Sequence, residues 1–302
     1  MKKSLFIQIV VCFIFSLIKI PSYAQKEKFS EIEKKADSLK IVRLFSQATD
    51  ERLKIYKQDS TYRDNIFEIA LLYSLSGEKE LAYDYLQRAL HTHNDIKFLS
   101  YGDFYYIRND ARWNVLRDKQ VEKYERINGK IKNKETAYVL WDTKMRDQAY
   151  YSYVDTENVD KEKIWAIKDS LNKINLKVLD SIVSHRGWPK KSEVGRSASV
   201  GAFLVIQHQE LPVQKKYFPF IEKAVKQQEA DKSDLALLTD RIRIFEGKKQ
   251  IYGSQVITDA KGEFDYKTLV DPSNVNKRRK KMDLPPIEEY LQMFGLKWEY
   301  KK

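Results

Sequence analysis

The sequence predicts a mainly α-helical protein with an N-terminal helical module, a second helical domain and one small β-hairpin near the C-terminus. Two observations predict this class. Apolar residues recur at the helical period through most of the chain as far as Phe245. After Gly247 the pattern changes, and residues 250–258 and 263–266 flank the turn sequence DAKG as the two arms of a hairpin would.

The first 24 residues have the pattern of a secretory signal peptide. Lys2 and Lys3 precede an apolar run over 5–20, and a small, polar end predicts cleavage after Ala24. An uncleaved membrane anchor is the alternative, but the run is interrupted by polar residues and is shorter than the roughly 20 residues that a spanning helix needs. We therefore expect an exported protein, periplasmic or secreted, that would contact a membrane only through this segment if it stayed uncleaved.

Cysteine content and charge limit the possible folds and partners. The only cysteine, Cys12, lies in the predicted signal peptide, so the mature chain would have to fold on a hydrophobic core without disulfides. The formal net charge of +12 would fall to +9 on cleavage, because the leader carries three lysines and no acid. A basic cytoplasmic protein suggests nucleic acid. For an exported chain we instead expect no nucleic-acid partner, and an envelope glycan, a peptide or a protein as the possible partner.

Residues 25–128 are expected to form the N-terminal helical module. Ser30 and Glu33 have the spacing of a capping box, in which two side chains satisfy the first amide groups of a helix. Apolar residues continue the helical pattern from there towards Tyr56. The sequence therefore predicts one long helix at the start of the module.

A more specific pattern covers residues 62–93. Apolar and small residues there allow two antiparallel helices to approach closely, and Gly77 suits the turn between them. The positions are Ile66, Ile69, Ala70, Tyr73, Gly77, Ala82, Leu86 and Ala89. This stretch resembles a single tetratricopeptide repeat, and 101–118 resembles the closing element of such repeats. Because a lone repeat cannot bury its own face, we expect a spacer or docking module; peptide binding on its concave side is the alternative.

The polar stretch NGKIKNKE at 128–135 is the predicted domain boundary, and the second helical domain is expected to cover 135–302. Periodicity, caps and breakers predict its helices at 135–154, 160–185, 192–211, 214–229 and 234–245, followed by two short helices. The predicted buried face of the second of these helices consists of Ile164, Ile167, Leu171, Ile174, Val178 and Ile182.

Short motifs in this domain match those of a known family in order and spacing. They are MRDQ at 145–148, IKDSLN at 167–172, GWP at 187–189, VG at 194–195, QH at 207–208, DR at 240–241, GKKQIYGSQ at 247–255 and KRRKKMDLPPIEEY at 277–290. Residues 140–290 thus resemble a bacterial family of unknown function that is common in secreted proteins of the Bacteroidetes type. The resemblance implies no established chemistry.

The candidate site is the helix end FLVIQHQ, residues 203–209, where His208 continues an apolar helix face. In the functional hypothesis His208 is a general acid or base, because its ordinary pKa of about 6.5 suits proton transfer. Asp240 would orient the imidazole and Tyr252 would position substrate, so these three are the predicted catalytic residues. The predicted ligand-binding residues are Gln207, Arg241, Gln250, Gln255, Asp147, Gln148, Asp169, Asn172 and Arg279.

The alternative assigns the same residues a structural role. Gln207 and His208 would cap a buried helix and bond to the hairpin backbone, and Asp240 and Arg241 would form a partly buried ion pair. The two hypotheses lead to two classes of function. We expect a ligand-binding or protein-interaction module, and the alternative is a hydrolase that acts on an envelope substrate with His208 as its acid or base.

Other chemistry lacks the required patterns. His91 and His93 point apart on a helix and have no acidic partners nearby, so no metal site is expected. The stretch GRSAS at 195–199 lacks the second glycine of a nucleophile elbow. No phosphate-binding loop or dinucleotide fingerprint is present, so no cofactor is expected. Glycosidase chemistry with paired carboxylates stays open, because such acids have no required spacing.

Overall fold

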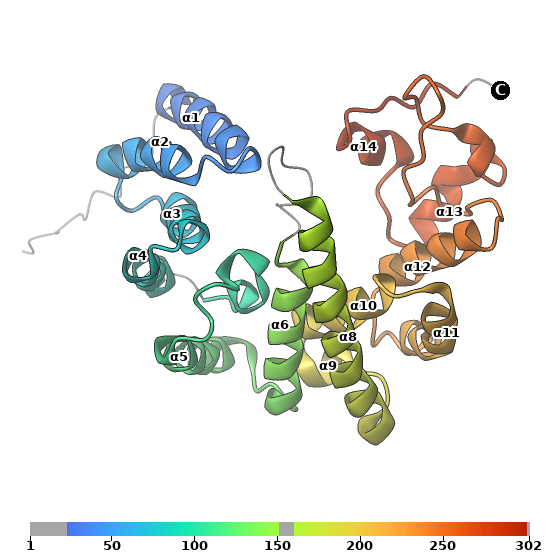
Figure 1. The fold of residues 1–302 in the computed structure, drawn as a ribbon, viewed down its shortest axis with the longest axis horizontal. Helices are drawn as coiled ribbons and strands as arrows, with labels where there is room; N and C mark the ends of the chain where they lie inside the picture. The colour runs from blue at the N-terminus through green and yellow to red at the C-terminus, as the bar shows by residue number, and fades with distance from the viewer. Residues whose placement is uncertain (1–22, 93, 151–159, 301–302) are drawn as a thin grey trace, which may run out of the picture.

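A computed structural model describes residues 23–92, 94–150 and 160–300, and these residues are mainly helical (Figure 1). The predicted signal peptide lies outside the described residues except for its last two positions. Within the described ranges, no helix has both the length and the apolar character needed to cross a bilayer. The predicted fold class is confirmed in its main feature, the predominance of α-helix.

The N-terminal half consists of helices that lie next to one another along one side of the molecule (Figure 1). They are α1 (Tyr23–Ile41), α2 (Phe45–Gln58), α3 (Arg63–Ser76), α4 (Lys79–Thr92) and α5 (Ala111–Asn128), with the short 3₁₀ helices η1 (Lys97–Ser100) and η2 (Gly102–Phe104) between the last two. α3 and α4 form the predicted helix pair, and Gly77 in its turn has a φ of 84°, which favours glycine.

One long helix towards Tyr56 was predicted, and the structure has two. The chain turns between α1 and α2 at Arg43, whose φ is 64°. Ion pairs then hold the two helices together. The guanidinium of Arg52, on α2, donates to Glu33 at 3.1 Å and to Asp37 at 2.6 Å, both on α1. Helical periodicity alone does not register such a turn, because the residues on either side of it keep their spacing.

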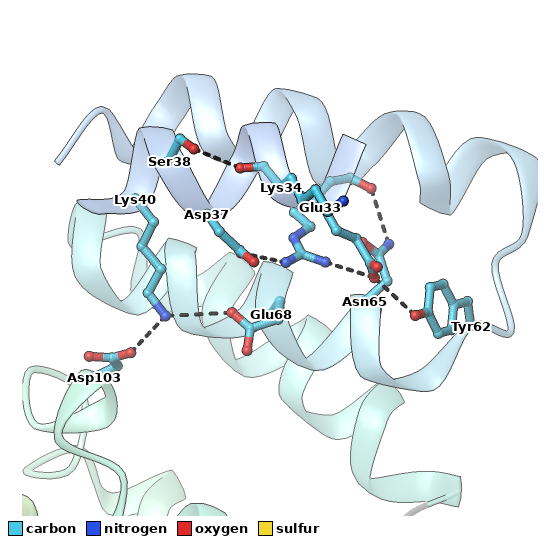
Figure 2. A network of polar contacts seen from close by, with 10 residues as sticks. Glu33, Lys34, Asp37, Ser38, Lys40, Tyr62, Asn65, Glu68 and Asp103 are labelled. Atoms are coloured by element: carbon cyan, nitrogen blue, oxygen red, sulfur yellow. Dashed lines mark hydrogen bonds and ion pairs between the residues drawn. The ribbon is translucent and has the colours of Figure 1, made fainter. Parts of the chain in front are cut away.

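Polar contacts also attach α1 to the helices that follow it. Figure 2 shows Lys40, from the end of α1, between Glu68 on α3 and Asp103 on η2. The Nζ atom of Lys40 is 2.9 Å from a carboxylate oxygen of Asp103 and 3.5 Å from one of Glu68. Tyr62 donates to Glu33 at 2.9 Å in the same network (Figure 2). Charge pairs thus complete the packing of a helix that has few apolar residues.

The C-terminal half begins with α6, which lies at the centre of the molecule (Figure 1). Its elements are α6 (Lys134–Gln148), α8 (Lys161–Arg186), α9 (Lys191–Val194), α10 (Arg196–Gln207), α11 (Leu211–Lys226), α12 (Lys232–Phe245), η3 (Tyr266–Thr268), η4 (Pro272–Asn274), α13 (Val275–Lys281) and α14 (Ile287–Gln292). α6 was expected to continue to 154, but it ends at Gln148, where the next residue leaves the helical conformation.

The predicted β-hairpin near 250–266 is corrected by the structure, since the described residues form isolated bridges and no strand. Thr258 and Phe264 make one antiparallel bridge, and Gln250 and Leu269 make one parallel bridge. Phe264 and Leu269 instead pack with Val275, Ile287 and Leu291 in a small separate core. The apolar side chains that predicted a hairpin thus pack against a helical cluster and not across a pair of strands.

α6 packs against both halves of the molecule. Leu140 and Trp141 on α6 belong to a continuous core that includes Phe104 from η2 and Val205 from α10. The structure also places backbone very close to α6 at two glycines, because a side chain at Gly201 or Gly102 would collide with it. The middle of α6 therefore lies directly against α10 at Gly201, and its end lies directly against η2 at Gly102.

Candidate functional site

The ends of α6 and α10 bring Asp147 and His208 together. Gly201 lets α10 approach α6, since a Cβ at this position would lie 2.8 Å from the carbonyl oxygen of Leu140. Farther along both helices, Nδ1 of His208 lies 2.8 Å from Oδ1 of Asp147, so a protonated Nδ1 donates to the carboxylate. The Asp147 side chain is 0% exposed and that of His208 is 16% exposed. The buried carboxylate therefore orients an imidazole that reaches the surface.

Two further polar groups surround this pair. Gln148 donates from Nε2 to Oδ2 of Asp147 at 2.6 Å. Lys168 on α8 is buried and donates to the backbone carbonyl of Asp147 at 3.3 Å. Burial lowers the pKa of Lys168 to about 8, although the nearby carboxylates of Asp147 and Asp169 oppose this shift. We define Asp147, Gln148, Lys168 and His208 as the His208 site.

The predicted pairing of His208 with Asp240 is corrected, because Asp240 binds backbone amides. Its buried carboxylate accepts hydrogen bonds from the amide of Ile251 at 2.7 Å, from that of Tyr252 at 3.1 Å and from that of Ser254 at 2.9 Å. The hydroxyl of Ser254 also donates to it at 3.0 Å. Asp240 thus organises the loop 250–255, and Asp147 is the acid at the imidazole.

The predicted amide residues hold the same loop. Gln250 is fully buried, accepts from the amide of Gln255 at 2.8 Å and donates to its carbonyl at 2.9 Å. Arg241 joins this loop to the His208 site, because it donates to the side chain of Gln255 at 3.0 Å and to the carbonyl of Gln207 at 2.8 Å. The predicted Asp240–Arg241 ion pair is therefore replaced by two separate sets of contacts.

Arg279 and Tyr252 complete the loop cluster. Arg279 is buried and donates to the carbonyl of Tyr252 at 2.8 Å and to that of Pro285 at 2.6 Å. Burial lowers the pKa of Arg279 and raises that of the Tyr252 phenol. These two residues lie with Asp240 and belong to a region that is held together by its own hydrogen bonds.

Two predicted ligand-binding residues lie outside both groups. The carbonyl of Asn172 accepts from Gln209 at 3.5 Å, and Asp169 is exposed on α8. The structure thus divides the predicted residues into the His208 site, with Asp147 and Gln148, and the loop cluster around Asp240. Arg241 connects the two groups through the carbonyl of Gln207.

Sequence reasoning missed Lys168, Asn175 and Gln214. The fully buried residues of α8 are Ile164, Lys168, Asn175 and Leu179; of the predicted apolar stripe only Ile164 is among them, and Ile174 is 45% exposed. A lysine and an asparagine at helical spacing from Ile164 and Leu179 were the available signal. Gln214 is also buried, and it caps α10 by donating to the carbonyls of Gln207 and Gln209.

Some buried polar atoms near the end of α10 have no hydrogen-bond partner among the described residues. They are Oε1 of Gln207, Oε1 of Gln214 and Nδ2 of Asn175. Buried polar atoms are satisfied in most proteins, so unsatisfied ones mark a place where a bound group would gain hydrogen bonds. Over the ranges that the structure covers, no group of three or more His, Cys, Asp and Glu side chains is arranged to hold a metal ion.

The Asp147–His208 contact is expected to show an energetic coupling of about 1 to 3 kcal/mol in a double-mutant cycle. His208→Ala should lower the free energy of unfolding, because it deprives a buried carboxylate of its partner. The loss should be smaller in an Asp147→Asn background. Urea unfolding of the four proteins measures the coupling. His185→Ala removes an exposed histidine of the same domain and is the control; additive effects of the two site mutations would contradict the prediction.

In a comparison with known proteins, the C-terminal half of the chain matches the model of one protein family. The model of a family described as a family of unknown function (DUF6624) matches residues 137–301. No curated protein and no solved structure matches the chain. The matched residues include both the His208 site and the loop cluster around Asp240.

Proposed function

Because the chain belongs to the family of unknown function DUF6624, we propose a function from the geometry of its domain: it binds a polar ligand at the His208 site. The observation that carries this proposal is the contact between the buried carboxylate of Asp147 and the partly exposed imidazole of His208. The carboxylate fixes the orientation of the ring before any ligand arrives, and such preorganisation reduces the entropic cost of binding.

The chemistry of the site favours a ligand with hydrogen-bond acceptors. Lys168 supplies an ammonium group and Gln148 supplies an amide, and both bond to Asp147, the residue that contacts the imidazole. The amide oxygen of Gln207, which has no partner within the described ranges, lies at the same helix end and would accept from a hydroxyl or amine of the ligand. Fragments of envelope glycans and short peptides present both kinds of group, so they are the ligand classes that we propose.

The cellular setting is part of the same proposal. The sequence pattern of 1–24 supports export to the periplasm or the medium, where envelope glycans and peptides are present. The helix pair α3–α4 has the spacing of a tetratricopeptide repeat, and it would serve as a spacer or docking module beside the ligand-binding domain.

A second candidate function is hydrolysis of an envelope substrate. It is favoured by one specific observation, the carboxylate–imidazole pair, because a carboxylate that fixes the tautomer of an imidazole also prepares it for general acid or base catalysis. In this alternative His208 transfers the proton and Asp147 is the positioning residue. Asp240 would have no part in the proton transfer, since its contacts are to the loop 250–255.

A ligand screen with a matched pair of variants tests the proposal. We expect a member of a library of glycan fragments and short peptides to raise the melting temperature of the wild-type protein. His208→Gln should weaken its binding about tenfold or more, whereas His185→Gln, at an exposed position, should retain it. Mass spectrometry of the same mixtures detects hydrolysis, and products that form only with an intact His208 would favour the second candidate. Equal affinity in wild type and His208→Gln would contradict the binding proposal, and equal product formation in the two proteins would contradict the second candidate.

A further inference from the structure

A separate cavity lies between the two halves of the molecule. It has a volume of about 380 Å³, which is within the size range of small-molecule sites. Its wall includes Tyr101 and Tyr124 from the N-terminal half and Trp141 from α6. We call it the Trp141 cavity. Aromatic side chains from both halves thus line one pocket that neither half would form alone.

An acid in this wall is buried without a hydrogen bond to its carboxyl group. Asp234 lies in the first turn of α12 and is only 9% exposed. Within the described residues its carboxyl group has electrostatic neighbours but neither a hydrogen bond nor an ion pair. Burial raises the pKa of Asp234 to about 7, and the charge of Asp231 acts in the same direction, while Arg196, Lys191 and Lys144 oppose it.

A lysine in the same wall also lacks a partner. Lys144 is half-buried on α6, and in the described part of the chain it makes neither a hydrogen bond nor an ion pair, including with Asp234. Burial lowers its pKa. Two other polar groups of the wall are already engaged: Arg196 pairs with Asp231 at 2.6 Å, and the hydroxyl of Ser197 bonds to that of Ser100 at 2.8 Å. Lys97, also in the wall, is exposed.

We infer that the Trp141 cavity binds a small zwitterion with an apolar body, in which Lys144 receives the carboxylate and Asp234 receives the ammonium group, as in a free α-amino acid. An unpaired buried charge is costly unless a partner of opposite sign and a hydrogen bond are supplied. The cavity contains one such group of each sign. The apolar part of the ligand would contact the aromatic wall.

Ligands of a single charge fit this wall less well. A simple carboxylate would leave the carboxyl of Asp234 without a cation and would lie near a second acid, Asp231. A simple amine would lie near Lys144 and Arg196 and would leave Lys144 unpaired. A neutral polyol would hydrogen-bond to both groups but would neutralise neither charge. Only a ligand that carries both signs satisfies both residues.

Binding of L-phenylalanine and two of its derivatives to the purified protein tests this inference by calorimetry. N-acetylation removes the ammonium group and amidation removes the carboxylate. We expect each derivative to bind about tenfold or more weakly than L-phenylalanine, because each leaves one buried charge unpaired. Absence of L-phenylalanine binding would overturn the inference. Equal binding of either derivative would also overturn it, because it would show a site for one charge only.

Two variants assign the charges to their residues. The Asp234→Asn variant should bind N-acetyl-L-phenylalanine as tightly as L-phenylalanine, because it has lost the partner of the ammonium group. The Lys144→Gln variant should likewise bind the amide of L-phenylalanine as tightly as L-phenylalanine itself. Lys223→Gln, an exposed lysine on α11, should keep the wild-type pattern. Asp234→Asn should also melt at a higher temperature than wild type at pH 8, because ionisation of the buried acid costs stability as pH rises from about 4 to 7. If both variants still bound the derivatives more weakly than L-phenylalanine, as wild type does, the assignment of the two charges to Asp234 and Lys144 would be overturned.

Discussion

Asp240→Ala is expected to lower the free energy of unfolding by an amount on the order of 4 kcal/mol. The carboxylate of Asp240 accepts from three backbone amides and from the hydroxyl of Ser254, and it is fully buried. Alanine would leave these donors without an acceptor, and each unsatisfied buried group costs about 1 to 3 kcal/mol. Relaxation of the loop towards water would recover part of the loss.

Chemical denaturation with matched substitutions measures this effect. Asp240→Asn should lose about half as much, because an amide offers one acceptor oxygen where the carboxylate offers two. Glu289→Ala removes an exposed carboxylate from α14 and should change stability by less than about 0.5 kcal/mol. A loss in Asp240→Ala no larger than in this control would show that the loop 250–255 does not depend on Asp240.

Gly102→Ala is expected to destabilise the protein by about 2 to 4 kcal/mol. A Cβ at this position would lie 2.6 Å from the carbonyl carbon of Gln148 and 2.8 Å from the amide nitrogen of Ala149. Both are backbone atoms, so the clash is relieved only if η2 moves away from the end of α6. The same movement would disturb Asp147, the neighbour of Gln148, and through it His208.

Two measurements distinguish this steric clash from the backbone strain that replacement of a glycine with positive φ causes. Gly262 has a φ of 79° and open space around it, so Gly262→Ala should cost only about 1 kcal/mol of backbone strain. In Gly102→Ala the NMR signals of the His208 imidazole should shift, and in Gly262→Ala they should not. A stability loss equal to that of Gly262→Ala, with unchanged imidazole signals, would contradict the close packing of η2 on α6.

Much of the fold is predictable from local sequence, because helix positions depend on local periodicity, caps and breakers. Gly77 at the turn of α3–α4 and Gly187 after α8 lie where the sequence places helix ends. The turn at Arg43 was missed, because the residues on either side keep the helical spacing and the ion pairs of Arg52 with Glu33 and Asp37 join residues distant in sequence. The hairpin was wrong for a related reason: the choice between strand and loop depends on what the apolar side chains meet in space.

The sequence predicted where the candidate site lies better than it predicted which side chains contact each other there. The end of α10 does collect polar residues, and Asp147 and Gln148 were among those expected there. The acid at His208 was misassigned, because Asp147 and His208 are 61 positions apart and no spacing rule relates them. Lys168 was overlooked for a different reason: the prediction counted only apolar residues, whereas the fully buried positions of α8 include Lys168 and Asn175 beside Ile164 and Leu179.

The central helix has a mechanical consequence. Trp141 and Lys144 face the Trp141 cavity from α6, and Asp147 lies one turn beyond Lys144 on the same helix. Both η2 and α10 contact this helix. A ligand that displaced α6 at the cavity would also displace Asp147, and thermodynamic linkage requires that two ligands coupled in this way alter each other's affinity by the same factor.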